Sequence, residues 1–302
     1  MEIVVFGAGS LGSLVGGLLA RDHEVTLVAR EAHARAVHES GLRLEGVFDD
    51  GPSRVFPVAT TDGTGLEADL AVVTVKAFDT ATAADALGTG SIEAVLSLQN
   101  GMGNESTLAA RLGAPVLAGT ATYGAILQEP GHVECTGSGE IVLGPRDGGS
   151  SALTDRVGAA FTAVGFETTV ADDMPRRLWE KLAVNAGINP ITALTATENG
   201  ATLEAPATDL ARDATRETAR VARACGVSLS NREALAAMEA VASATTANTS
   251  SMAQDVLGER RTEIDAINGY VVDRAVENGL EVPTNRTLTA LIRTWEQGRD
   301  LR

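Results

Sequence analysis

The sequence has very little lysine: Lys76 and Lys181 are the only two, and the other 22 of its 24 basic side chains are arginines. At a protein surface either cation serves, but a group that must release a proton cannot be arginine, which stays charged. Drift in a GC-rich or salt-adapted genome would also remove lysines and leave a few by chance. The surroundings of the two lysines must therefore decide whether they serve chemistry.

Cysteine is scarce as well, and its spacing argues against a metal centre. Cys135 and Cys225 are far apart, with no CxxC motif and no neighbouring cluster of ligands, so we expect idle thiols and no metal. Long apolar runs are missing too, because the stretch 11–20 follows acidic Glu2 and is too short to span a bilayer. We therefore expect a cytoplasmic protein.

Positive charge is outnumbered, and the formal net charge is −16. Such a chain lacks the basic patch that nucleic acid or an anionic membrane would need. A small-molecule substrate is then the expected partner, and a homodimer stays open. Many acidic residues and only 3% aromatics resemble proteins of salt-loving organisms, so we expect a halophilic-like acidic surface.

The length of 302 residues suits two domains of roughly 150 residues each. In the first half, short apolar runs alternate with helix-compatible stretches, which is typical of an α/β Rossmann-type domain with a mostly parallel, doubly wound sheet. The expected strands are 2–6, 24–29, 70–75, 94–98 and 116–120, the expected helices are 13–20, 79–87 and 105–112, and 131–134 and 140–144 are expected as antiparallel edge strands.

From Pro175 onward the pattern is almost entirely helical. We therefore place a dinucleotide-binding domain at 1–173 and an all-α substrate and catalytic domain at 174–302. Pro190 removes a backbone donor, so the helix that contains it should kink or end there. The expected helices are 176–189, 205–225, 231–245 and 259–278.

A glycine-rich turn follows the first expected strand and opens the first helix. Within a βαβ unit its G-x-G-x-x-G spacing indicates dinucleotide binding. Gly7 permits the tight turn, Gly9 lets the backbone approach a pyrophosphate, and Gly12 allows close helix packing. The cofactor-binding candidates in this turn are Gly7, Ala8, Gly9, Ser10, Leu11 and Gly12.

The end of the second strand bears on the choice of cofactor. NAD enzymes usually place an acidic residue there for the ribose 2′-hydroxyl, whereas this strand closes with Ala29 and Arg30, which suit a 2′-phosphate. We therefore favour NADPH as cofactor, with Arg30 as a binding residue. Glu31 follows immediately and could reach the ribose, which keeps NADH as the alternative.

Two further polar residues follow strand ends. Lys76 and Asn100 come just after expected strands, at the edge where open α/β sheets bind ligands. Either could touch the nicotinamide half of the cofactor or the substrate, although Asn100-Gly101 could also be a simple turn.

In the helical half, Lys181, Asn185 and Asn189 are four residues apart, which places them along one helical face. Asparagine is a poor helix former, so two in line indicate buried amides or a ligand. Judged alone, Ser251 could cap a helix and Glu263 could be a solvated charge on a helix face.

In combination these motifs resemble those of the ketopantoate reductases (2-dehydropantoate 2-reductases), almost from end to end. The landmarks are the glycine turn, Val73-Thr74-Val75-Lys76-Ala77, Gln99-Asn100-Gly101-Met102-Gly103, Trp179-Glu180-Lys181-Leu182-Ala183-Val184-Asn185, Asn189-Pro190, Ser250-Ser251-Met252 and Thr262-Glu263-Ile264-Asp265. The resemblance implies NADPH-dependent reduction of 2-dehydropantoate to (R)-pantoate, a step toward pantothenate and coenzyme A.

By this resemblance, Lys181 matches the general acid of the family and Glu263 its substrate-holding glutamate. The chemistry agrees, because hydride arriving at a ketone builds negative charge on oxygen, and the helical half has Lys181 but no histidine. The remaining matches are Asn100, Asn185, Asn189, Asn199 and Ser251 in the substrate cleft, with Lys76 and Asn100 facing the cofactor.

Two alternatives stay open. One is a related lysine-dependent dehydrogenase for another hydroxy acid or keto acid; a phosphate-bearing substrate would want cations, whereas residues 181–199 offer amides. The other is a regulator that binds NADPH without turnover, which would have no use for Lys181 and Glu263.

Overall fold

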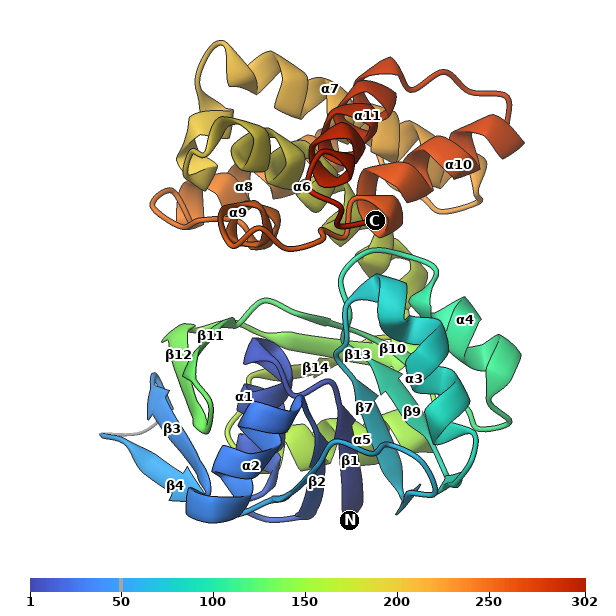
Figure 1. Ribbon diagram of the computed structural model, residues 1–302. Helices are drawn as coiled ribbons and strands as arrows, with labels where there is room; N and C mark the ends of the chain where they lie inside the picture. The colour runs from blue at the N-terminus through green and yellow to red at the C-terminus, as the bar shows by residue number, and fades with distance from the viewer. Residues whose placement is uncertain (49–50) are drawn as a thin grey trace. The chain divides into compact units, whose positions relative to one another are not determined.

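The computed structural model describes residues 1–48 and 51–302. The chain forms two compact units, drawn in Figure 1: Met1–Gln99 with Asn104–Met174, and Asn100–Gly103 with Pro175–Arg302. No helix in these described ranges is long and apolar enough to cross a membrane.

An eight-stranded sheet forms the centre of the first unit. Every pair of neighbouring strands is parallel except one: β10 (Val116–Ala121) and β13 (Ile141–Pro145) pair antiparallel. From β1 the chain order runs in opposite directions, to β2 on one side and β7 on the other, and such a switch point is where open α/β sheets bind ligands. In spatial order the strands are β14 (Thr168–Val170), β13 (Ile141–Pro145), β10 (Val116–Ala121), β9 (Val95–Ser97), β7 (Leu70–Val73), β1 (Glu2–Phe6), β2 (Glu24–Val28) and β5 (Val58–Thr60).

Both faces of this sheet are covered. Ile3 and Val5 of β1 belong to the core on one face and Val4 to the core on the other, because side chains alternate along a strand. This double covering explains why the strands are continuous apolar runs in the sequence, and it confirms the predicted doubly wound α/β class. The helices are α1 (Ser10–Leu19), α2 (Glu31–Ser40) and α5 (Ala152–Ala163), which contribute to the first core, and α3 (Thr80–Leu87) and α4 (Asn104–Arg111), which contribute to the second.

A smaller sheet in the same unit corrects one prediction. Residues 131–134 and 140–144 were expected as edge strands, but β12 lies between β11 and β3, and β13 is covered by β14. The covering strands β3 and β14 are short and partly polar, so the sequence pattern does not indicate them as strands. The sheet consists of β11 (Gly124–Glu129), β12 (His132–Gly137), β3 (Leu42–Gly46) and β4 (Ser53–Val55), and β6 (Glu67–Ala68) pairs separately with β8 (Ser91–Ile92).

The second unit is built from helices, which confirms the predicted all-α character. Its helix α8 begins with a capping box, in which the Ser230 hydroxyl accepts from the Glu233 N–H and the Glu233 carboxylate accepts from the Ser230 N–H. The helices are α6 (Met174–Thr195), α7 (Ala207–Ala224), α8 (Asn231–Ala244), α9 (Ser251–Leu257), α10 (Tyr270–Glu277) and α11 (Pro283–Gln297), with a 3₁₀ turn η2 (Asn199–Leu203) and a π-helical turn η3 (Asp265–Gly269).

The single helix predicted over 259–278 is wrong. Glu259 has a φ of 49°, a left-handed conformation that ends the preceding helix. Thr262 then donates its N–H and its hydroxyl to Oε1 of Glu296, at 2.8 and 2.7 Å. Because that amide is bound by a carboxylate from α11, the chain stays irregular and Glu263 precedes the next helix instead of lying within it.

The sequence predicted that the helix containing Pro190 would kink or end there. Helix α6 does not end at Pro190 but continues to Thr195. Proline offers no N–H to the carbonyl four residues earlier, which is that of Ala186. Here the side chain of Asn268 donates to this carbonyl at 3.1 Å. A side chain distant in sequence thus replaces the missing backbone donor.

Candidate functional site

The glycine turn joins β1 to α1 at the carboxyl edge of the sheet. Gly7 has a φ of 106°, and a Cβ there would lie 2.7 Å from the backbone nitrogen of Val75. A Cβ on Gly12 would lie 2.4 Å from the Gly7 carbonyl oxygen, which also accepts from the Thr74 hydroxyl at 2.9 Å. Both positions therefore need glycine.

Gly9 differs from these two glycines because nothing crowds it. Its residue is exposed, and the nearest atom to a Cβ there would be the Gly7 carbonyl oxygen at 4.0 Å. Gly9 directly precedes α1, whose first turn has no side-chain cap, so that helix end suits an anion. The turn fits the pyrophosphate of a dinucleotide, with open backbone where the ligand would approach.

A buried histidine braces the same turn. His33 on α2 is 4% exposed; its Nδ1 accepts from the Gly131 N–H at 3.0 Å, so Nε2 carries the proton and donates to the Ser13 hydroxyl at 3.0 Å. Ser13 in turn donates to the Ala8 carbonyl at 3.2 Å. Burial lowers the pKa of His33, which keeps the ring neutral as both bonds require. Sequence reasoning missed this residue because its partners are distant along the chain.

Arg30 and Lys76 lie at the same edge as the glycine turn, since they follow β2 and β7, the parallel neighbours of β1. Arg30 is exposed and precedes α2, while Lys76 is half-buried and precedes a short 3₁₀ turn. Gln99 holds the Lys76 loop, because its Nε2 donates to the Val75 carbonyl at 3.0 Å and to the Thr80 hydroxyl at 2.7 Å. The first unit thus presents two cations beside its glycine turn.

In the second unit, Lys181, Asn185 and Asn189 lie on α6 at the predicted spacing. Lys181 and Asn185 are half-buried and Asn189 is 5% exposed. Buried core residues flank them on the same helix: Leu182, Ala183, Val184, Ala186 and Ile188. A lysine and two amides on a helix packed into the core form a polar stripe that suits a small polar ligand.

The segment Asn100–Gly103 packs within this second unit. Met102 donates its N–H to the Ala266 carbonyl at 2.9 Å. Gly101 has a φ of 79°, and a Cβ there would lie 2.6 Å from the same carbonyl oxygen. Asn100 is therefore part of a tight turn, and the turn is tethered to the residues that follow Glu263.

Glu263 is 6% exposed, so the reading of this residue as a solvated face charge is wrong. Its carbonyl accepts from the N–H groups of Ala266 and Ile267, both at 3.1 Å. A buried carboxylate is costly unless donors surround it. A group of this kind suits the binding of a substrate hydroxyl.

Ser251 is the first residue of α9 and is exposed, and the cap of that helix is its neighbour Ser250, whose hydroxyl accepts from the Ala253 N–H at 3.1 Å. The capping role considered for Ser251 is therefore wrong by one residue. The Ser250 hydroxyl also pairs with that of Thr192 at 2.7 Å, which ties the start of α9 to α6 one turn beyond Asn189.

Asn199 is buried and mainly joins two segments of the helical unit. Its Nδ2 donates to the Thr245 hydroxyl and its N–H to the Asn248 carbonyl, both at 2.9 Å. Its Oδ1 is buried with no hydrogen-bond partner in the described part of the chain. The bonds of Asn199 that the structure shows therefore hold η2 against the segment that follows α8.

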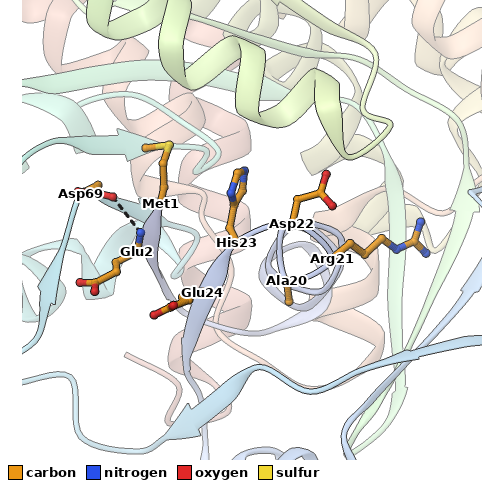
Figure 2. Close-up of a pocket in the computed structure, with 8 residues that line it drawn as sticks. All are labelled: Met1, Glu2, Ala20, Arg21, Asp22, His23, Glu24 and Asp69. Carbon is orange, nitrogen blue, oxygen red and sulfur yellow. Dashed lines mark hydrogen bonds between the residues drawn. The ribbon is translucent and has the colours of Figure 1, made fainter.

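A cavity of about 670 Å³ lies at the opposite, amino edge of the parallel sheet (Figure 2). Its walls include Glu2 and Glu24, which begin β1 and β2, and Asp69, which accepts from the Glu2 N–H at 2.9 Å. The carboxyl edge, where the glycine turn lies, is the ligand-binding edge of such sheets, so we do not assign this cavity to the site. Within the described ranges, no group of three or more His, Cys, Asp or Glu side chains could hold a metal ion.

Family models match most of the chain. The model described as ketopantoate reductase PanE/ApbA matches residues 3–148, and the model described as ketopantoate reductase PanE/ApbA C terminal matches residues 173–296.

Similarity to individual proteins extends over the whole chain. It is 46% identical over 300 residues to a 2-dehydropantoate 2-reductase of Halobacterium salinarum, covering 97% of this chain and 98% of that protein. The crystal structure of a PanE/ApbA family ketopantoate reductase from Ralstonia eutropha JMP134 is 36% identical, with a TM-score of 0.91, and covers 99% of this chain and 100% of its own. A structure of D-mandelate dehydrogenase with NADH is 25% identical, with a TM-score of 0.88 and full coverage of both chains.

We expect Gly9→Ala to weaken binding of a nicotinamide dinucleotide by about tenfold or more, which is about 1.4 kcal/mol per factor of ten. The added methyl group meets open space in the protein, so the melting temperature should not change. Gly12→Ala is the matched control: its methyl group would collide with the Gly7 carbonyl and should lower both affinity and melting temperature. Undiminished affinity in Gly9→Ala, measured by fluorescence titration, would place the pyrophosphate elsewhere.

We expect the stability of the protein to depend on His33 between pH 5 and 8. Because burial lowers the pKa of His33 in the folded state, the unfolded chain binds more protons as the pH falls below about 6.5, and stability should decline. His33→Gln should flatten this decline in urea unfolding and cost about 1–3 kcal/mol at pH 8 through unpaired buried groups. Exposed His38 on the same helix gives the control His38→Gln; equal pH profiles for both variants would contradict the assignment.

Proposed function

This chain belongs to the ketopantoate reductase family, and we propose that it reduces 2-dehydropantoate to (R)-pantoate with NADPH, in the cytoplasm. Residues 1–173 would form the dinucleotide-binding domain, and residues 174–302 the substrate domain, to which the segment Asn100–Gly103 adds. One observation carries the proposal: the only lysine of the helical half lies in line with two asparagines on the core helix α6.

The glycine turn fits a nicotinamide dinucleotide, since Gly9 leaves the backbone open while Gly7 and Gly12 pack closely. When bound, NADPH supplies a hydride to the carbonyl carbon of the substrate. Arg30 favours NADPH over NADH because a guanidinium suits the ribose 2′-phosphate. Lys76, at the neighbouring strand end, would add a second cation on the cofactor side.

Lys181 would act as the general acid. As the hydride arrives, the carbonyl oxygen gains negative charge, which the ammonium group stabilises. Lys181 then donates one proton to that oxygen, so the alkoxide becomes a hydroxyl, and the neutral amine regains a proton from solvent. Arginine would stabilise the charge without readily releasing a proton, which would account for a lysine at this position in a chain with only one other lysine, Lys76.

The remaining polar groups of the helical unit would bind and orient the substrate. The buried carboxylate of Glu263 would accept a hydrogen bond from the substrate hydroxyl. Amide groups would donate to the carboxylate and keto oxygens of the substrate. The amides and the serine proposed to bind the substrate are Asn100, Asn185, Asn189, Asn199 and Ser251.

Similarity to D-mandelate dehydrogenase with NADH favours one competing candidate, a dehydrogenase for another hydroxy acid or keto acid. Glu31 beside Arg30 is the residue that would suit NADH. A regulator without turnover is less well supported, because it would have no use for a proton donor on α6 or for a buried glutamate.

Oxidation of NADPH and NADH should be followed with 2-dehydropantoate and with a panel of other 2-keto acids, in low and high salt. We expect the highest kcat/KM with NADPH and 2-dehydropantoate. We also expect higher activity in high salt, because 40 acidic side chains repel one another less when screened. Turnover of another keto acid with none of 2-dehydropantoate would overturn the substrate, and full activity in very low salt would overturn the salt dependence.

Lys181→Ala should lower kcat by about 10²- to 10⁴-fold, the usual contribution of a general acid, and leave the Kd for NADPH unchanged. Lys181→Arg should also be slow, because it retains charge without a transferable proton. Lys76→Arg serves as the control, since a cation at that position should preserve part of the activity. An unchanged kcat in Lys181→Ala would refute the assigned role.

A further inference from the structure

Three buried polar side chains form a continuous hydrogen-bonded chain through the helical unit. Glu217 of α7 is 8% exposed, while Asn285 of α11 and Asn268 of η3 are fully buried. Glu217 Oε2 accepts from Asn285 Nδ2 at 2.8 Å, and Asn285 Oδ1 accepts from Asn268 Nδ2 at 2.9 Å. This series of hydrogen bonds ends on α6, where Asn268 Nδ2 also donates to the carbonyl of Ala186 at 3.1 Å.

The direction of this hydrogen-bonded series is fixed at its Asn285 end. Asn285 Nδ2 also donates to the Ala214 carbonyl at 3.0 Å, and a carbonyl only accepts hydrogen bonds, so the amide nitrogen of Asn285 faces Glu217 and its oxygen faces Asn268. Asn268 therefore turns its amino group toward both Asn285 and Ala186. The Oδ1 of Asn268 is buried without a partner among the described residues, which is a cost, so this residue serves the structure through its donor.

The acceptor at the end of the chain lacks its usual partner. Ala186 lies four residues before Pro190, and a proline has no N–H to donate to it. A buried carbonyl left unpaired in this way costs free energy. The amide of Asn268 supplies the donor that the helix lacks, at the one turn of α6 that lies between Asn185 and Asn189.

Asn268 also belongs to the turn that starts at Glu263. The Glu263 carbonyl accepts from the N–H groups of Ala266 and Ile267, and the Ile264 carbonyl accepts from that of Gly269 at 2.8 Å. Asn268 therefore joins two segments whose residues carry different parts of the proposed reaction, Lys181 on α6 and Glu263 just before η3.

We propose that Asn268 is a positioning residue. It pairs the Ala186 carbonyl, which Pro190 leaves without a backbone donor, and thereby fixes α6, which carries Lys181, relative to the turn that begins at Glu263. This inference rests on the proposed roles of Lys181 and Glu263. Asn268 is fully buried, so its effect on the reaction would pass through the placement of the other two side chains.

The first test is Asn268→Leu, a side chain of similar size without a donor. We expect kcat/KM for 2-dehydropantoate to fall roughly 10- to 100-fold, as for a small misplacement of reacting groups. The melting temperature should fall as well, and the Kd for NADPH should stay unchanged. Asn278→Leu is the matched control, because exposed Asn278 donates to the Arg274 carbonyl at the end of α10 and to the Cys225 sulfur. Neither partner belongs to the proposed site, so this variant should keep wild-type kcat/KM.

The double variant Pro190→Ala/Asn268→Leu separates positioning from simple stabilisation. Alanine restores the backbone donor to the Ala186 carbonyl, so the melting temperature should rise above that of Asn268→Leu, although it stays below that of Pro190→Ala because Asn285 Oδ1 loses its donor. The tether to the Glu263 turn remains absent, so kcat/KM should stay at least about tenfold below that of Pro190→Ala. If Asn268→Leu alone is insoluble, the double variant still carries the comparison.

Three results would overturn the inference: wild-type kcat/KM in Asn268→Leu, recovery of kcat/KM together with the melting temperature in the double variant, or a double variant no more stable than Asn268→Leu. Lys181→Ala, measured alongside, keeps this outcome distinct from failure of the proposed function. If Lys181→Ala retains turnover, the proposed role of Lys181 fails whatever Asn268 does.

Discussion

A buried backbone amide or carbonyl must be paired, because leaving it unpaired costs about 1–3 kcal/mol. In this protein several of the proposed functional residues lie on or beside backbone that departs from regular helix or strand, where the usual partners are missing. In each case a side chain from elsewhere in the same unit supplies the partner. The pairs are Thr74 with the Gly7 carbonyl, His33 with the Gly131 N–H, Gln99 with the Val75 carbonyl, Glu296 with the Thr262 N–H and Asn268 with the Ala186 carbonyl.

This pairing makes irregular segments rigid enough to carry chemistry. A side chain that acts in a reaction has to be held close to its productive geometry by neighbours that are themselves held. Around Glu263 such support comes from α11 through Glu296, from the segment Asn100–Gly103 through Met102, and from α6 through Asn268.

The sequence predicted what local pattern and known motifs can encode. The apolar runs of β1, β7 and β10, the glycine turn and the helical second half follow from periodicity and residue type, because those signals lie within a few residues of one another. The pairs that support the site do not, since Thr262 and Glu296 are 34 residues apart and Gly131 and His33 are 98 apart. For the same reason the sequence could not predict that α6 continues past Pro190. The Ala186 carbonyl, which proline leaves without a backbone donor, is paired by Asn268, a residue 82 positions away.

The segment Asn100–Gly103 has a consequence for how the gene can be divided. Its four residues follow a strand of the first unit, yet they pack in the second, where Met102 contacts the core and binds Ala266. The chain therefore crosses between the units three times, and neither unit corresponds to one continuous stretch of coding sequence. A helical half exchanged between relatives at a single cut near residue 174 would meet a foreign version of this segment, and any side chain larger than glycine at position 101 would collide with Ala266.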